Sequence, residues 1–151
     1  MQVELWDIAR PKPYERNPRK IPEKAIKKVA ASIQEFGFRS PVVVDEQGVI
    51  LAGHTRLQAA KALGLRQVPV HVATGLSEAQ TKAYRLADNR VAQETDWLDD
   101  VLKIELGALA ELGFDLDLTG FDVPELTKLL HSEEDVERAE IAPSEAPAAA
   151  P

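Results

Sequence analysis

The residues best suited to chemistry form one short run, Gly53, His54, Thr55 and Arg56, between an apolar stretch and an expected helix. Where a strand passes into a helix, unpaired backbone N–H groups and the positive end of the helix dipole favour an anion. Gly53 has no Cβ, so a ligand can come close, and His54 and Thr55 can donate hydrogen bonds. The planar fork of Arg56 matches two phosphate oxygens. The run indicates a phosphate-binding loop; the alternative is a glycine that merely turns the chain.

A second polar group lies further along the chain. Arg85, Asp88 and Asn89 are three and four positions apart, so they share one face of an expected helix. A carboxylate beside an amide suits Mg²⁺, which usually keeps waters and borrows phosphate oxygens. The alternative is a surface ion pair between Arg85 and Asp88, worth roughly 0.3 kcal/mol.

His54 is the candidate catalytic residue, because an imidazole can carry a proton near neutral pH. A simpler role, as a hydrogen-bonding residue of the loop, stays open. His71 and His131 form no metal-binding pattern with it, and the chain has no cysteine. We therefore expect neither a zinc site nor thiolate chemistry.

Short strands and helices alternate around these residues and predict an α+β fold, a small mixed sheet with helices packed on it, followed by a helical extension. The expected strands are residues 3–8, 41–44, 48–51 and 68–72, and the expected helices begin at Pro22, near Thr55 and after Ser77. Ser77 can cap its helix while Gln80 reaches back. Pro69 suggests that the last strand lies at an edge or starts there.

Two further patterns concern burial along the later helices. The helix after Ser77 is expected to bury Ala79, Ala83, Leu86 and Ala87. A helix from Asp96 to about Gly113 is expected to run through Trp97, Val101, Ile104 and Leu106. A short entry at residues 122–124 then precedes a last helix to about Leu130.

Charge divides the chain unevenly. Residues 1–90 hold 15 Lys or Arg and 9 Asp or Glu, whereas residues 91–151 hold 3 and 16, for a net charge of −7 overall. A basic face attracts polyanions at long range, although a solvated helix surface is the alternative. The acidic region is a poor surface for a DNA groove, and no helix-turn-helix is evident in it.

These features predict a domain over residues 1–93, a helical extension over 94–131 and an acidic, then Ala/Pro-rich linker over 132–151. The N-terminus has no signal-peptide pattern, and no apolar run reaches the roughly 18 residues that span a bilayer. We expect a soluble, cytoplasmic protein without a membrane partner.

The order of motifs resembles a known family. Asn17-Pro18-Arg19, then Ser32-Ile33 with Gly37, then Pro41 to Val44, then Gly53 to Arg56 before an alanine-rich helix follow one another over about sixty residues. This order is similar to the boxes of the N-terminal domain of the ParB/sulfiredoxin superfamily.

The resemblance implies a function for the loop. ParB partition proteins bind CTP with Mg²⁺ on this fold, so Gly53, His54, Thr55 and Arg56 would cradle the triphosphate, with Arg19 as a second positive charge. Asp88 and Asn89 would hold the metal, and Asn89 also the phosphates. Sulfiredoxins carry their nucleophilic cysteine where His54 stands, so their chemistry is excluded. The acid that partition proteins tie to CTP hydrolysis is also missing.

A downstream resemblance extends the match to about residues 1–131. Residues 86–90, 97–99, 113–115 and 119–122 are similar to the ParB-like domain found ahead of phage and prophage DNA amino-methyltransferases. This implies a fused or partner methyltransferase domain. The catalytic Asp/Asn-Pro-Pro-Tyr/Trp motif of those enzymes is absent from this sequence.

Three hypotheses follow. The first is a targeting or regulatory module of a DNA-modification or mobile-element protein, which binds a nucleoside triphosphate or DNA phosphate and has DNA and nucleotide as partners. The second is a metal-dependent nuclease or nucleotide hydrolase. The single carboxylate near the loop argues against it, because two-metal chemistry needs more carboxylate ligands. The third is a protein-interaction domain with a vestigial loop. Homodimerisation stays open.

Overall fold

The computed structural model describes residues 1–129, and the chain divides into two compact units, Met1–Thr95 and Asp96–Pro151. Each unit has its own hydrophobic core. The linker expected at residues 132–151 lies outside the described residues, and the expected boundaries at 93 and 131 stay predictions. None of the helices in residues 1–129 has the length and apolar character needed to cross a bilayer.

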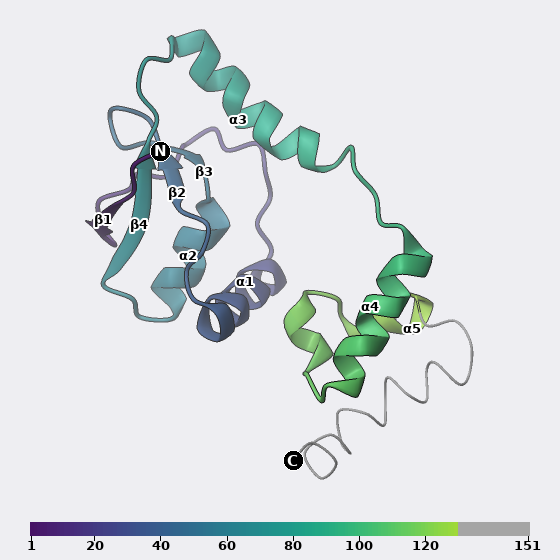
Figure 1. Ribbon diagram of the computed structural model, residues 1–151. Helices are drawn as coiled ribbons and strands as arrows, with labels where there is room; N and C mark the ends of the chain where they lie inside the picture. Colours follow the sequence, from purple (N-terminus) through teal and green to yellow (C-terminus); the bar gives the residue numbers. More distant parts are fainter. Residues whose placement is uncertain (130–151) are drawn as a thin grey trace. The chain divides into compact units, whose positions relative to one another are not determined.

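The first unit is built on a four-stranded mixed sheet (Figure 1), in the order β1-β4-β2-β3. The strands are β1 (Glu4–Asp7), β2 (Val42–Val44), β3 (Ile50–Ala52) and β4 (Gln67–Val72). β1 with β4 and β2 with β3 pair antiparallel, whereas β2 with β4 pairs parallel. The expected α+β class and its mixed sheet are confirmed.

Pro69 does not mark an edge or a strand start, because β4 lies between β1 and β2 and begins at residue 67. Backbone groups of alternate residues in a strand face the same neighbouring strand. The Ala73 N–H donates to Val44 O at 2.8 Å, so position 69 also faces the β2 side. An N–H at position 69 would need an acceptor on the segment before Val42, where β2 has not yet begun. The missing N–H of Pro69 therefore removes no hydrogen bond between β4 and β2.

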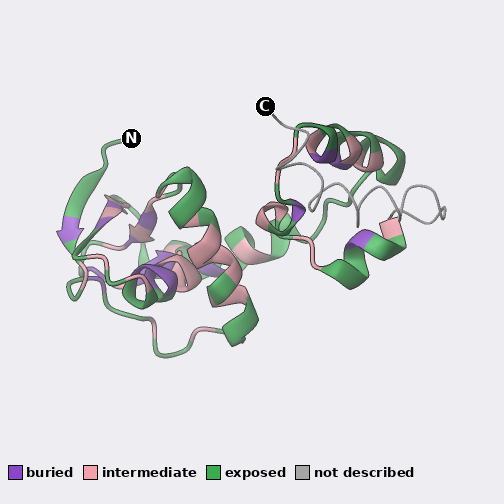
Figure 2. Cartoon of the chain, turned by 90° about the horizontal axis from the view of Figure 1, so that it is seen from below, coloured by how far each residue is buried: buried purple, intermediate pink, exposed green. Residues whose placement is uncertain are grey.

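The core of this unit lies between the sheet and α2 (His54–Ala62), and α1 (Glu23–Phe36) packs against α2. Figure 2 shows the buried positions gathered in the strands and in α2. The core residues are Trp6, Val42, Val44, Ile50, Leu57, Ala60, Val68 and Val70. This packing fixes the point at which β3 passes into α2.

The third helix, α3 (Glu78–Ala92), begins at the expected capping box, in which Gln80 N–H donates to Ser77 Oγ at 3.1 Å. The prediction that α3 buries Ala79, Ala83, Leu86 and Ala87 is wrong. Leu86 is 59% exposed, and Arg85 is the one buried residue of the helix. The reason is that α3 meets β3 with a polar face, so its alanines and Leu86 point away from the core.

The second unit contains α4 (Asp99–Glu111), the 3-10 helix η1 (Leu116–Thr119) and α5 (Val123–Leu129). The helix expected from Asp96 begins three residues later. Of the residues through which that helix was expected to run, Leu106 is buried, whereas Trp97, Val101 and Ile104 are exposed, Ile104 by 70%. The face that packs inward instead carries residues 102, 106, 109 and 110, which also follow helical spacing.

Candidate functional site

The loop between β3 and α2 has the backbone geometry of an anion site. Gly53 is the N-cap of α2 and lies in the left-handed region, with φ 107°. A Cβ at this position would lie 3.2 Å from Val42 Cα and 3.0 Å from Arg56 Nη2, so a side chain would crowd both groups. No side chain caps the N-terminus of α2. Its first-turn amides therefore remain suited to an external anion.

Arg56 faces into the unit. Its Nη2 donates to Pro41 O at 2.9 Å, and its buried Nε has no hydrogen-bond partner among the described residues. Burial lowers the pKa of Arg56, the negative charge of Asp88 partly offsets this, and an arginine so placed stays protonated. The Nη2 group of Arg56 thus donates to the backbone, whereas its Nε–H group is still able to donate a hydrogen bond.

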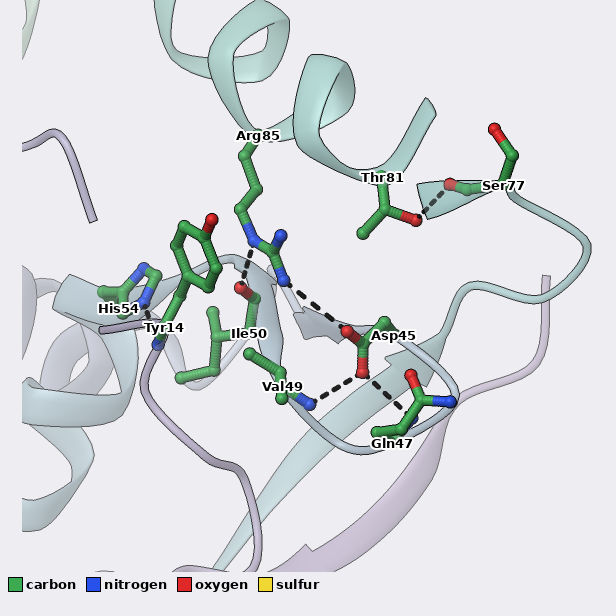
Figure 3. Close-up of polar contacts among 9 residues, drawn as sticks. All are labelled: Tyr14, Asp45, Gln47, Val49, Ile50, His54, Ser77, Thr81 and Arg85. Atoms are coloured by element: carbon green, nitrogen blue, oxygen red, sulfur yellow. Dashed lines mark hydrogen bonds and ion pairs between the residues drawn. The ribbon is translucent and has the colours of Figure 1, made fainter. Parts of the chain in front are cut away.

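His54 holds a neighbouring loop. The Tyr14 N–H donates to His54 Nε2 at 3.1 Å (Figure 3). Nε2 is therefore an acceptor, which places the proton of the neutral ring on Nδ1. Burial, and then the charge of Arg85, lowers the pKa of His54. The structure gives His54 a hydrogen-bonding role; its role as a proton carrier stays a prediction.

Arg85 is 6% exposed and makes contacts with three separate segments (Figure 3). Its Nε donates to Ile50 O at 3.0 Å, its Nη2 lies 3.5 Å from Asp45 Oδ2, and its guanidinium stacks 3.7 Å above the Tyr14 ring. The surface ion pair considered between Arg85 and Asp88 is wrong, since the partner of Arg85 is Asp45 on the turn between β2 and β3.

All the site residues expected from the sequence line one pocket of about 370 Å³. The loop 17–22, the loop between β3 and α2, and α3 all contribute to its lining, together with two residues of α1. The pocket has the size of a small-ligand site. The expected residues that line it are Arg19, Gly53, His54, Thr55, Arg56, Asp88 and Asn89.

The acidic and amide groups of the pocket fit a metal ion that arrives with its ligand. Asp88 is the carboxylate in the lining, and Asn89 uses its Nδ2 on Arg85 O at 2.9 Å, which leaves its Oδ1 as an acceptor. In residues 1–129 no group of three or more His, Cys, Asp or Glu could hold a metal by itself. A Mg²⁺ ion here would depend on phosphate oxygens and waters.

The sequence did not indicate three residues that support the site: Tyr14, Asp45 and Arg85 in its buried role. All three line a second pocket of about 810 Å³, and Arg85 lines both pockets. Asp45 lies in an expected turn and Tyr14 in an expected loop, but no spacing rule joins either of them to Arg85, 40 and more residues away.

Comparison with family models identifies the first unit. The model described as the ParB N-terminal domain matches residues 2–90. The chain belongs to the ParB N-terminal domain family. A second model, described as the ParB-methyltransferase HTH domain, matches residues 100–151. The expectation of no helix-turn-helix is therefore wrong, because the acidic charge that prompted it concerns partners and not the fold of a segment.

Proteins with similar sequences include members of the same family. The ParB-like nuclease domain-containing protein YnaK of Escherichia coli (strain K12) is 41% identical over 68 residues, which cover 45% of this chain and 78% of YnaK. The chromosome-partitioning protein Spo0J of Thermus thermophilus is 31% identical over 110 residues, 70% of this chain. The chain spans only 40% of the length of Spo0J.

Solved structures share the fold. The C-terminally truncated chromosome-partitioning protein ParB from Caulobacter crescentus, complexed with CTP-gamma-S, matches with a TM-score of 0.64 at 19% identity, over 93% of this chain and 78% of that one. A Pnob8-like ParB-N domain matches with a TM-score of 0.51 at 18% identity, over 92% of this chain and 51% of that one.

Proposed function

We propose that this ParB N-terminal domain binds a nucleoside triphosphate of the CTP type in the pocket around Gly53 and Arg56. The observation that carries the proposal is the convergence of all seven expected residues on one pocket beside an uncapped helix N-terminus. The fold neighbour from Caulobacter crescentus, whose structure contains CTP-gamma-S, supports the same choice of ligand.

Each group has a distinct task in this proposal. The first-turn amides of α2 and the hydroxyl of Thr55 donate to phosphate oxygens, since both lie at the positive end of the helix. Arg56 and Arg19 add charge from two different segments of the pocket lining. His54 keeps the loop that contains Tyr14 in place, because it accepts the Tyr14 N–H.

Asp88 and the Oδ1 of Asn89 are the groups that would hold Mg²⁺. A bound Mg²⁺ would neutralise part of the phosphate charge. Asp88 also adds a negative charge near Arg56, which favours the charged guanidinium. We therefore expect the affinity for the triphosphate to fall when Mg²⁺ is removed.

We assign the binding to a targeting or regulatory role in a DNA-modification protein, with a methyltransferase as the fused or partner enzyme. The match of residues 100–151 to the ParB-methyltransferase HTH domain supports this role, and it also supports DNA as a partner. The hydrolase alternative has no supporting observation in the described residues and stays a prediction. A supercoiled-plasmid nicking assay with and without chelator tests it.

Calorimetry with CTP, ATP and GTP, each with Mg²⁺, tests the binding. Arg56→Ala should weaken binding of the preferred triphosphate about tenfold or more, because a charge-assisted contact is lost. Lys61→Ala is the matched control, since Lys61 is exposed near the end of the same helix and does not line the pocket. Binding that is unchanged in a folded Arg56→Ala variant would overturn the assignment of the loop.

A further inference from the structure

Arg85 joins α3 to the rest of the first unit. It is the buried residue of α3, and its Nε donates to Ile50 O at the start of β3, three residues before Gly53. The wall of the pocket formed by Asp88 and Asn89 follows on the same helix, one turn later. The position of this wall therefore depends on how Arg85 is held.

A second part of the pocket wall depends on the same guanidinium. Arg85 stacks 3.7 Å above the Tyr14 ring, and the Tyr14 N–H donates to His54 in the phosphate loop. The wall that begins at Asn17 follows three residues after Tyr14. A stacked arginine is attracted to an aromatic face, so this contact holds the loop as well as the helix.

Asp45 keeps the guanidinium in place from the third side. Its Oδ1 accepts the N–H groups of Gln47 and Val49 at 2.9 Å each, so the carboxylate is fixed by its own turn (Figure 3). Its Oδ2 lies 3.5 Å from Arg85 Nη2. Arg85 also lines the pocket, but its Nε, its Nη2 and one face of its guanidinium are engaged by protein groups, so its described contacts are contacts with the fold.

We propose that Arg85 is a positioning residue that holds two parts of the nucleotide-pocket wall, loop 17–22 and α3, relative to the Gly53–Arg56 loop. The inference rests on the proposed function of that pocket. Lysine cannot replace Arg85 in this role, because an ammonium lacks the planar fork and the stacking face.

The test compares the affinity for CTP with Mg²⁺ among Arg85→Met, Arg85→Lys and Asp45→Asn. Arg85→Met and Arg85→Lys should each weaken binding about tenfold, the effect of misplacing both walls, and Asp45→Asn less. In the double variant Arg85→Met/Asp45→Asn the loss should equal that of Arg85→Met alone, because the two residues act through one contact. Lys82→Met, on the same helix but outside this pocket, should bind like the natural chain.

A second measurement needs no ligand. Hydrogen exchange at the Tyr14 amide should accelerate in Arg85→Met, since loss of the stack frees the loop from His54. The pKa of the His54 ring, followed by NMR, should rise in Arg85→Met more than in Arg85→Lys, which keeps the charge. Asp45→Asn retains the acceptor for its turn amides and remains informative if Arg85→Met does not fold.

The outcomes separate the two proposals. If the natural chain binds no triphosphate, the proposed function fails, and the Tyr14 amide alone decides the role of Arg85. Natural affinity in a folded Arg85→Met or Arg85→Lys variant, or unchanged Tyr14 exchange in Arg85→Met, would overturn the positioning role. An equal loss in Lys82→Met would show that the effect is not specific to Arg85 and would overturn the positioning role as well.

Discussion

At the scale of single residues, Gly53 joins the backbone of the sheet to the proposed phosphate loop. Its conformation is left-handed, and a Cβ added to it would lie only 3.2 Å from Val42 Cα, so a side chain would meet both backbone strain and a tight contact. Gly53→Ala should lower the free energy of unfolding by roughly 2 kcal/mol, as for a strained residue without room to relax. Urea denaturation measures this change.

Gly64→Ala is the control for Gly53→Ala. Gly64 also has a positive φ, 72°, but a Cβ there would meet nothing within 4 Å. Its substitution carries the strain without the contact and should cost only about 1 kcal/mol. Equal losses at both glycines would mean that the close approach of Val42 has no energetic effect.

The burial of His54 predicts a dependence of stability on pH. Because its pKa is lowered in the folded chain, the unfolded chain takes up a proton first, near the ordinary value of about 6.5. This contribution to stability is complete above that pH and is lost as the pH falls toward the pKa of the folded state.

Replacing His54 by glutamine tests this, since an amide oxygen can still accept the Tyr14 N–H but does not titrate. The free energy of unfolding, measured in urea at pH 7.5 and 5.5, should fall less in His54→Gln than in the natural chain. The same fall in both chains would show that other groups cause the pH dependence.

At the scale of elements, local signals were sufficient where neighbours in sequence decide the structure. The capping box of Ser77 and Gln80, the pair β2–β3 and the passage from β3 into α2 all follow from residues close together. The exposure of Ala79, Ala83 and Leu86 on α3 could not be predicted in this way, because these residues follow helical spacing whether or not another element covers them. Which face packs inward was decided by Asp45 and Ile50, which lie far from α3 in sequence.

The same limit applied to α4. Val101 and Ile104 fit a helical stripe as well as Leu102, Leu106 and Leu109 do, so periodicity alone offered two faces. The packing of η1 and α5 selected the second face. The residues of the candidate site were easier to predict, because a glycine and an arginine where a strand passes into a helix suit an anion whatever the rest of the fold.

At the scale of the whole molecule, charge and core divide at nearly the same place. The basic residues of 1–90 belong to the unit that contains the pocket, whereas the acidic majority follows it. The two hydrophobic clusters share no residue. Separate cores are the mark of units that can fold alone.

A chain of residues 1–95 alone should therefore fold and keep the pocket. All the residues that line it lie before residue 90, and the core cluster of this unit ends at Val72. In NMR spectra, amide signals of residues 1–90 should overlay those of the full chain, and the affinity for CTP with Mg²⁺ should change less than about threefold, a loss of under 1 kcal/mol. An unfolded fragment would mean that the second unit supplies stability that its separate core does not reveal. A folded fragment without affinity would instead place part of the binding energy beyond Thr95.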